Sequence, residues 1–269
     1  DFDLNIQNGF YLNLLLGDVK GQIRYDDAKS KLIFSKMEAK KVNTVYRAEG
    51  LIQLGDADLI DLKFNFSDGY VQNILQIFEN LTKPFWWFPE SLSGNVSGQV
   101  HVHGGLDLKE LIIKSSIKGV DWDYFGERFT RVSMGLSYNK GDYQITDAVG
   151  VKYRGLVRGQ IGFTKKSELS WNIKTERFQM SDFDHIGMLD IPFGGDVVIQ
   201  SDGSGVLGRV KSKTVASLKK LSIKGLSYQD SDLLLETDDQ TIKMSGNGLG
   251  GSALFSSQYN LKAGSKNFI

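Results

Sequence analysis

The chain has 269 residues, and its 32 lysines and arginines balance its 32 aspartates and glutamates, so the formal net charge is zero. Nucleic-acid-binding proteins normally carry a basic excess, so this balance argues against nucleic acid as a partner. The chain has no cysteine, which excludes disulfide scaffolds, thiolate zinc sites and thiol catalysis. Its 30 glycines against 3 prolines favour many twisted strands joined by tight turns.

Three segments of the chain share one strand pattern. They are GDVKGQIRY at 17–25, GNVSGQVHV at 94–102 and, more loosely, RGLVRGQIGF at 154–163. In each, aliphatic and polar residues alternate between glycines, which is typical of a strand with one dry face and one wet face. A unit that recurs in this way usually stacks on its neighbours, so the pattern predicts an elongated repeat protein.

The clearest helical segment follows the strand with Leu62, Phe64 and Phe66. We expect Ser67 or Asp68 to cap its start and Pro84 to end it. Its apolar residues recur at the spacing of one helix face, and they are Val71, Ile74, Leu75, Phe78 and Leu81.

A dense aromatic patch, Phe85, Trp86, Trp87 and Phe88, comes directly after this helix and is bracketed by Pro84 and Pro89. One interpretation is a loop that folds back to cover one end of the sheet, since such rings bury much area. The other is a contact with lipid or a partner, because Trp is favoured where apolar and wet surroundings meet.

Strands between residues 131 and 173 carry apolar side chains at every second position, the pattern of an antiparallel meander with one wet face. Near residue 155, we expect Lys152, Arg154, Arg158 and Gln160 on the polar face. The residues expected on the apolar face are Val132, Met134, Leu136, Tyr138, Val151, Tyr153, Val157, Ile161, Phe163, Leu169, Trp171 and Ile173.

A second, fainter helix is predicted where Ser181 and Asp182 precede Phe183, Ile186 and Leu189. Several strands followed by a short helix therefore recur at about 100 residues. We expect three repeats, a first meander over 1–90, a second over 91–190 and a third, less regular one over 191–269. Turns are predicted where Asn, Asp, Lys and Gly cluster, at 139–142, at 202–205 and at 238–239.

Residues that might carry chemistry are few. His101 and His103 lie two apart, so both side chains leave one face of a strand, and Asp107 is near, but two ligands without a third are a weak metal signal. His185 stands alone and is interpreted as structural. Asp121, Asp123 and Glu127 lack an activating partner and fit ordinary turns.

The sequence also lacks a nucleophile elbow, a phosphate-binding glycine loop and a calcium loop. It contains no run of about 18 apolar residues that could span a bilayer. We therefore expect a protein that is not an enzyme and uses no cofactor or metal.

The strand pattern, together with a short amphipathic helix between meanders, resembles the periplasmic repeats of AsmA-like proteins, and within them most of all the translocation and assembly module group. The likeness covers most of the chain and is strongest from Leu92 to Met188, while 211–269 match less cleanly. It implies a long, bent antiparallel sheet of taco- or groove-like shape with an apolar lining that holds phospholipid acyl chains. It also implies a periplasmic location in a Gram-negative bacterium, an inner-membrane anchor elsewhere in a longer protein, and an outer-membrane barrel protein as partner.

The residues themselves leave the architecture open. The same alternation would suit a closed β-sandwich, whose apolar face packs on a second sheet. We carry three functions forward: a segment that conducts phospholipid between the two membranes, a scaffold that receives strands of outer-membrane proteins by β-augmentation, and a β-sandwich adhesin or binding module.

Overall fold

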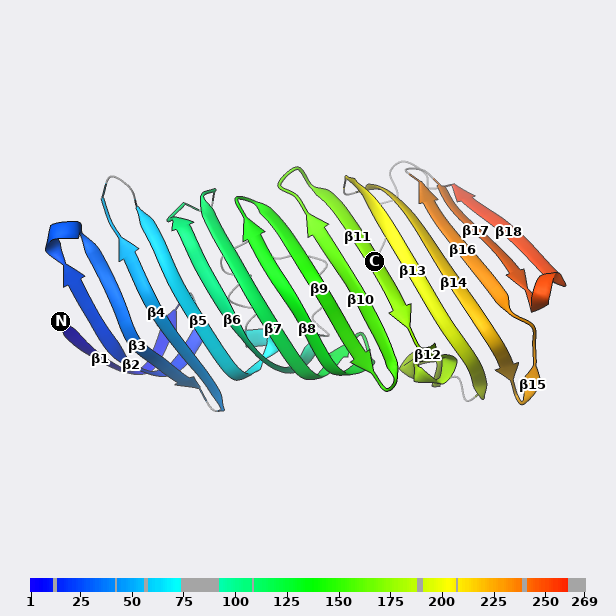
Figure 1. Ribbon diagram of the computed structural model, residues 1–269, viewed down its shortest axis with the longest axis horizontal. Helices are drawn as coiled ribbons and strands as arrows, with labels where there is room; N and C mark the ends of the chain where they lie inside the picture. Colours follow the sequence, from blue (N-terminus) through cyan, green and yellow to red (C-terminus); the bar gives the residue numbers. More distant parts are fainter. Residues whose placement is uncertain are drawn as a thin grey trace. The chain divides into compact units, whose positions relative to one another are not determined.

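The computed structural model describes the chain except residues 12–13, 42, 56–57, 74–91, 108, 188–190, 207, 239–240 and 261–269. Its contacts divide the chain into two compact units, Asp1–Tyr143 and Gln144–Ile269. The described residues are almost entirely β-structure, and each strand pairs antiparallel with its ladder neighbours (Figure 1). The prediction of an all-β fold built from antiparallel meanders is therefore confirmed.

In unit 1 the strands follow one another in chain order, and each of them pairs with the next. One 3-10 turn, η1 (Asp27–Lys29), separates the second strand from the third. The strands are β1 (Phe2–Tyr11), β2 (Leu14–Asp26), β3 (Lys31–Lys41), β4 (Thr44–Gln53), β5 (Leu59–Tyr70), β6 (Ser93–Gly105), β7 (Leu111–Tyr124) and β8 (Glu127–Asn139).

Unit 2 begins within β9 (Asp142–Lys152). Its main ladder runs β9, β10, β11, β13, β14, β16, β17, β18, and the short strands β12 and β15 pair with β13 and β14. The remaining strands are β10 (Gly155–Phe163), β11 (Glu168–Glu176), β12 (Phe178–Gln179), β13 (Phe193–Val206), β14 (Arg209–Ile223), β15 (Leu226–Ser227), β16 (Ser231–Asp238), β17 (Thr241–Gly248) and β18 (Ala253–Asn260). The helical turns are η2 (Met180–Asp182), α2 (Asp184–Gly187) and η3 (Leu249–Gly251).

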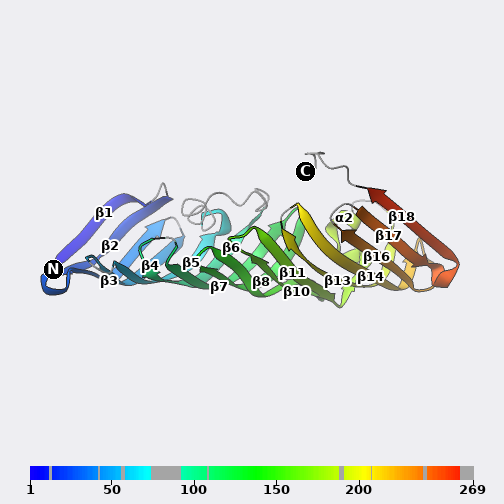
Figure 2. The same ribbon diagram turned by 90° about the horizontal axis from the view of Figure 1, so that it is seen from above.

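Each unit is a single layer of strands (Figure 2). No second sheet packs on it within the part of the chain that the structure describes. We call the face with Leu62, Phe64 and Phe66 the apolar face of unit 1, and the face with Ile161 and Trp171 the apolar face of unit 2. The opposite side of each sheet is its charged face. A closed sandwich of the described strands is therefore not the architecture of either unit.

As far as β14, every second strand of the ladder has a non-glycine residue in the left-handed conformation, within it or directly after it. In unit 1 these residues are Asn8, Lys36, Asp68 and Asp121, with φ between 51° and 54°. Unit 2 continues the pattern with Asp147, Arg177 and Lys220. The ladders of β1, β3, β5 and β14 slip in register at these residues, and so does the β6–β7 ladder. Asn8, Lys36, Asp68, Asp121 and Lys220 are therefore β-bulges, which bend a strand and increase its twist, and we call all seven left-handed residues the bulge row.

Side chains of neighbouring segments hold three of these bulges in place. The backbone N–H of Asp68 donates to Ser97 Oγ at 3.1 Å, and that of Lys220 donates to Asp230 Oδ1 at 3.0 Å. The N–H of Asn8 lies 3.4 Å from Asp18 Oδ1. Each bond satisfies a backbone donor that the bulge removes from the regular ladder.

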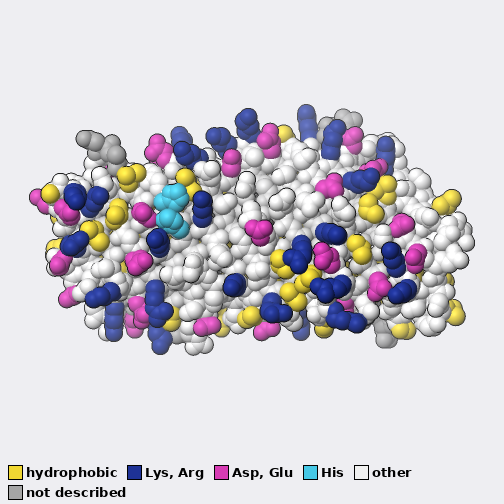
Figure 3. Space-filling view, viewed as in Figure 1, with side chains coloured by type: hydrophobic (Ala, Val, Ile, Leu, Met, Phe, Trp, Pro, Cys, Tyr) yellow, Lys and Arg dark blue, Asp and Glu magenta, His cyan; other side chains and the backbone are white. Residues whose placement is uncertain are grey.

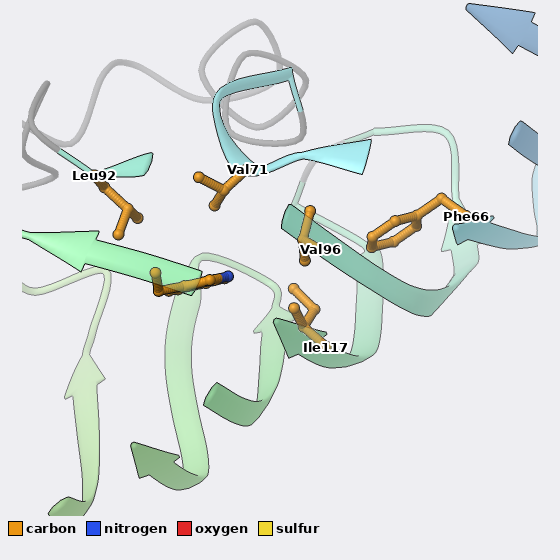
Figure 4. Close-up of a cluster of buried hydrophobic side chains, with 6 residues drawn as sticks. Phe66, Val71, Leu92, Val96 and Ile117 are labelled. Carbon is orange, nitrogen blue, oxygen red and sulfur yellow. The ribbon is translucent and has the colours of Figure 1, made fainter. Parts of the chain in front are cut away.

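The main core of unit 1 lies along its bulge row. Phe66 and Val71 flank the bulge at Asp68, and they pack with Leu92, Val96, Ile117 and Trp122 (Figure 4). The Trp122 indole N–H donates to the Asn95 carbonyl at 2.9 Å. The sheet therefore buries apolar area by bending over itself, without a covering layer.

The recurrent glycines of the strand pattern leave space on the apolar face. A Cβ on Gly98 would lie 2.9 Å from the ring of Phe66, and one on Gly159 would lie 3.1 Å from Ile173. A Cβ on Gly21 would likewise come too close to the side chain of Met37. Large side chains of the next strand thus lie across each glycine, which explains why the pattern recurs.

One predicted turn is confirmed, one is wrong and one lies partly outside the described residues. Lys140 and Gly141 form the turn after β8, Asp238 ends β16, and residue 239 is outside the described residues. Residues 202–205 instead lie inside β13. Gly203 is directly opposite Trp171, whose indole occupies the space of a side chain there, so this glycine serves packing and not a turn.

The predicted helices begin close to where we expect them. Helical residues start at Val71 and are described as far as Asn73, and the rest of that prediction lies outside the described residues. The expected cap is wrong, because Ser67 and Asp68 belong to β5, which runs to Tyr70. The second helix is confirmed as η2 and α2, with Asp182 accepting the Gln179 N–H at 2.7 Å. Among the described residues no helix has both the length and the apolarity to cross a membrane.

Replacing a bulge residue by glycine should stabilise the fold. Lys36 is exposed and has φ of 51°, a conformation that costs a non-glycine residue about 1–2 kcal/mol. After the entropy cost of glycine, Lys36→Gly should raise the free energy of unfolding by about 0.5–1 kcal/mol in urea denaturation. The exposed Lys40, also in β3, is the control, and Lys40→Gly should lower stability by a similar amount. Equal destabilisation by both would contradict a strained bulge at Lys36.

Candidate functional site

Strand register aligns apolar side chains into rows on the apolar face of unit 1. Leu62 pairs with Val102, Val102 with Ile113, and Ile113 with Tyr138. Paired residues of neighbouring strands lie side by side on the same face of a sheet. These four residues therefore form one row that continues from β5 to β8. The far half of this face, away from the bulge row, is therefore apolar over at least four strands.

The opposite face of the same strands is polar. The neighbouring row runs Lys63, His101, Lys114 and Ser137. The space-filling view looks onto this face and shows positive lysines and arginines interspersed with negative carboxylates, with the histidine pair among them (Figure 3). Such a mixed charged surface stays in water, so the two faces of the sheet differ sharply in what they can bind.

The predicted lining residues of β8 lie on the apolar face of unit 1. Val132, Met134 and Leu136 pack against the main core cluster. Tyr138 is buried with Leu111 and Ile113 in a second, smaller cluster, where its ring contacts that of Tyr143 at a tilt of 54°, with centroids 4.8 Å apart. The structure thus brings all four together, with the tyrosine at the end that is farthest from the bulge row.

Most of the lining residues predicted after residue 150 share the apolar face of unit 2. Ile161 pairs with Trp171, Phe163 with Leu169, and Val157 with Thr175. Ile173 pairs with Gly159, the glycine that makes room for it. These strands, β10 and β11, give unit 2 an apolar surface comparable to that of unit 1.

Two predictions around β9 are wrong. Lys152, expected on the polar face, is only 1% exposed, and strand alternation then places Val151 on the opposite side. Tyr153, expected to line the apolar face, lies in the turn before β10 and is 66% exposed. Residues 153–154 form the turn between β9 and β10, so the alternation predicted along one continuous strand from 151 to 163 does not carry across it.

Lys152 anchors the short helix α2. Its Nζ lies 2.6 Å from Asp184 Oδ2, and the two side chains are 2% and 25% exposed. Nearby, Phe183 stacks on Phe178 with ring centroids 5.3 Å apart. A buried cation requires such a partner because desolvation is costly, so this ion pair fixes α2 against the sheet.

Removing one member of this ion pair should lower the free energy of unfolding more than removing both members. Lys152→Met leaves the Asp184 carboxylate unpaired, and we expect a loss of about 2–3 kcal/mol in the free energy of unfolding, the low end of the range because Asp184 keeps some solvent. The double variant Lys152→Met/Asp184→Leu should recover most of it. Urea denaturation of both variants measures the difference, and equal losses would contradict a buried pair.

The histidine pair lies on the charged face of unit 1. His101 Nε2 is 2.7 Å from Asp61 Oδ1, and the two imidazole rings are 4.8 Å apart. Asp107 does not join them in any interaction that the structure records, and it accepts the Lys109 N–H in a turn at 2.9 Å. No cluster of three or more potential metal ligands occurs among the described residues.

The candidate carboxylates have structural roles. Asp121 is a bulge residue, and Asp123 accepts the Gly126 N–H at 2.8 Å in the turn between β7 and β8. His185 lies in α2. The aromatic patch Phe85, Trp86, Trp87 and Phe88 lies outside the described residues, so both interpretations of it stay predictions.

Two tyrosines on the apolar face of unit 1 have pKa values above the ordinary one. Burial raises the pKa of Tyr46, against a smaller opposite effect of the Thr44 hydroxyl. Burial also raises the pKa of Tyr138, and the nearby carboxylates of Asp107 and Asp142 act in the same direction. Both side chains are therefore held in the neutral form, as an apolar surface requires.

These shifts predict how stability depends on pH. The folded tyrosines keep their protons above the ordinary pKa of 10.0, whereas the unfolded ones release them. The folded state then binds more protons, so stability should fall as pH rises through and above that value. The variant Tyr46→Phe/Tyr138→Phe should lose less stability between neutral and alkaline pH than the parent, with exposed Tyr259→Phe as control. Parallel pH curves would contradict the prediction.

Sequence reasoning missed the bulge row and the buried lysine. Their signal is present in the chain, because two apolar or small residues separated by two others interrupt the alternation at each bulge, as in Phe34–Met37 and Leu218–Leu221. This spacing places both residues on the apolar face, one on each side of the left-handed residue.

Comparison with known proteins adds no assignment, since no family model, curated protein or solved structure matches this chain.

Proposed function

We propose that this chain is a non-enzymatic segment that conducts phospholipid across the periplasm, with its apolar faces as the track for acyl chains. The observation that carries the proposal is a single-layer sheet whose apolar face continues over consecutive strands, while the described residues supply no second sheet to cover it. Ordinary monomers rarely leave so contiguous an apolar surface without a partner.

The chemistry of the face favours an acyl chain over a polypeptide. The backbone groups of the inner strands are used within the ladders, so the apolar face offers side-chain carbon and few hydrogen-bonding groups. A peptide laid on it would leave its own amide groups unsatisfied, which costs free energy. An acyl chain has no such groups and gains about 0.8 kcal/mol for each CH2 that leaves water.

The same face would permit movement. Successive rows consist mainly of Val, Ile, Leu, Phe and Met side chains, which differ little in polarity, with Gly98, Ser115 and Tyr138 among them. A hydrocarbon chain therefore has similar free energy at neighbouring positions, and sliding from strand to strand meets low barriers. The AsmA-like resemblance agrees with this function, and with it we propose a periplasmic location, an inner-membrane anchor in a longer protein and an outer-membrane barrel protein as partner.

A second candidate is a scaffold for outer-membrane protein assembly. It is favoured by β18, which pairs with β17 and whose other edge meets no described strand. The sequence of β18, ALFSSQYN, has no charge and no proline, whereas natural edge strands usually carry such protection. A strand of another protein could add there by β-augmentation. This use of the edge leaves the apolar face free and does not compete with the first proposal.

Lipid retention tests the leading function directly. The chain purified from cells should carry phospholipid in native mass spectrometry. Leu136→Asp and Val157→Asp place a carboxylate on the apolar faces, and each should reduce the retained lipid at least about tenfold while circular dichroism keeps its β-sheet signal. Ser137→Asp, one residue away on the charged face, is the matched control and should retain lipid as the parent does.

Photo-crosslinking distinguishes the two functions. A benzophenone side chain at Leu136 should trap lipid if the face is a track, whereas one at Tyr259, in the edge strand β18, should trap client polypeptide if that edge receives strands. A chain that retains no lipid and traps none at Leu136 or Val157 would overturn the proposed function.

A further inference from the structure

The apolar face of unit 2 changes character from β13 onward. Hydroxyl side chains replace hydrocarbon in its far half. The indole N–H of Trp171 donates to Ser201 Oγ at 3.0 Å, and Ser201 Oγ lies 2.8 Å from Thr214 Oγ1. One step farther from the bulge row, Ser212 Oγ and Thr237 Oγ1 are 2.8 Å apart. We call Ser201, Ser212, Thr214 and Thr237 the hydroxyl patch.

Strand register places the patch in the path that β10 and β11 begin. Ile173 pairs with Ser201, and Ser201 with Thr214. Farther from the bulge row, Trp171 pairs with Gly203, and Gly203 with Ser212. An apolar row of unit 2 thus runs directly into hydroxyl groups and a glycine. In unit 1 the corresponding far half holds Val102, Ile113 and Tyr138.

The patch satisfies its own hydrogen bonds. Thr237 Oγ1 lies 3.4 Å from the Val210 carbonyl, to which it can donate, while it accepts from Ser212. Ser201 accepts from the Trp171 indole and shares a second bond with Thr214. Because these groups are used within the sheet, the patch offers little to a lipid headgroup. It is also poor for an acyl chain, because its serine and threonine side chains and Gly203 offer less hydrocarbon surface than the Val, Ile and Leu side chains around them.

The near half of the same strands stays apolar. Beside the bulge at Lys220, Val197 pairs with Leu218 and Ile199 with Ala216, which pairs in turn with Leu233. A hydrocarbon path therefore continues there at reduced width. The contrast between the two halves lies within single strands, so the same β13 and β14 present both surfaces.

We infer that the hydroxyl patch is a specificity-determining constriction, which excludes acyl chains from the far half of β13 and β14 and confines them to the row of Ile199, Ala216 and Leu233. The inference rests on the proposed function, since it assigns where on the apolar face the acyl chains run. It predicts that removing the hydroxyls widens the path without adding any new surface.

The absence of native cysteine permits a position-by-position test on the full chain. Single cysteines at Val210, in the far half, and at Ala216, in the near half, would carry a bimane fluorophore. Leu136→Cys reports on unit 1, and Ser137→Cys on the charged face serves as control. The probe is a phosphatidylcholine vesicle with brominated acyl chains, which quench bimane on contact.

We expect quenching at Ala216 and Leu136, with little at Val210 and Ser137. In the background Thr214→Val/Thr237→Val, which exchanges hydroxyl for methyl at nearly constant volume, apparent lipid affinity at Val210 should rise about tenfold. Ser204→Val, on the charged face of β13, should leave Val210 as it was. Circular dichroism and urea denaturation confirm that each labelled variant is folded.

The quenching results distinguish the constriction from the lipid track itself. Equal quenching at Val210 and Ala216 in the parent background, with quenching at Leu136, overturns the constriction and keeps the lipid track. Unchanged quenching at Val210 after both threonine substitutions also overturns it. The absence of quenching at Leu136, Ala216 and Val210 together rejects the proposed function and the constriction with it.

Discussion

The bend at the bulge row is the constraint on which the rest of each unit depends. A single-layer sheet has no partner layer against which to bury its apolar side chains, so its stability must come from folding over itself. Each left-handed residue makes this possible at a modest backbone cost. The bend buries apolar side chains in exchange, because Phe66, Val71 and Trp122 pack together where the strands bend.

The same bend leaves the far half of the apolar face with less cover. Side chains such as Leu62 and Val102 are half-buried by their row neighbours and are not enclosed by another layer of the described chain. Stability therefore comes from one half of the sheet, while the other half is available to bind. A sandwich could not divide its apolar face in this way, since packing would consume all of it.

The charged face has a complementary role. Lysines, arginines and carboxylates are interspersed on it (Figure 3), so no large single-sign patch dominates it. Pairs such as Arg47 and Glu38, at 3.0 Å, are exposed and add little to stability. Their effect is to keep one side of a thin sheet in water, which orients apolar ligands toward the other side.

Sequence periodicity was sufficient to predict the strands, their antiparallel order and the sidedness of β8, β10 and β11. It failed where a local feature of the chain interrupted the two-residue alternation. Lys152 was assigned to the wrong face because the alternation predicts one strand over 151–163, whereas residues 153–154 form the turn between β9 and β10. Residues 202–205 resembled a turn because Gly203 makes room for Trp171. The partners that decide both positions, Asp184 for Lys152 and Trp171 for Gly203, lie on other segments, which a pattern along one strand does not contain. The choice between sandwich and single layer was likewise beyond periodicity, since it concerns what packs on the face.

The most direct test of this account is a crystal structure of the chain with a phospholipid brominated on its acyl chains. We predict anomalous bromine density along the apolar face of unit 1, over the row from Leu62 to Tyr138, with none on the charged face beside His101. Bromine density confined to the charged face, or a second layer of protein that occupies the row and leaves no space for lipid, would contradict it.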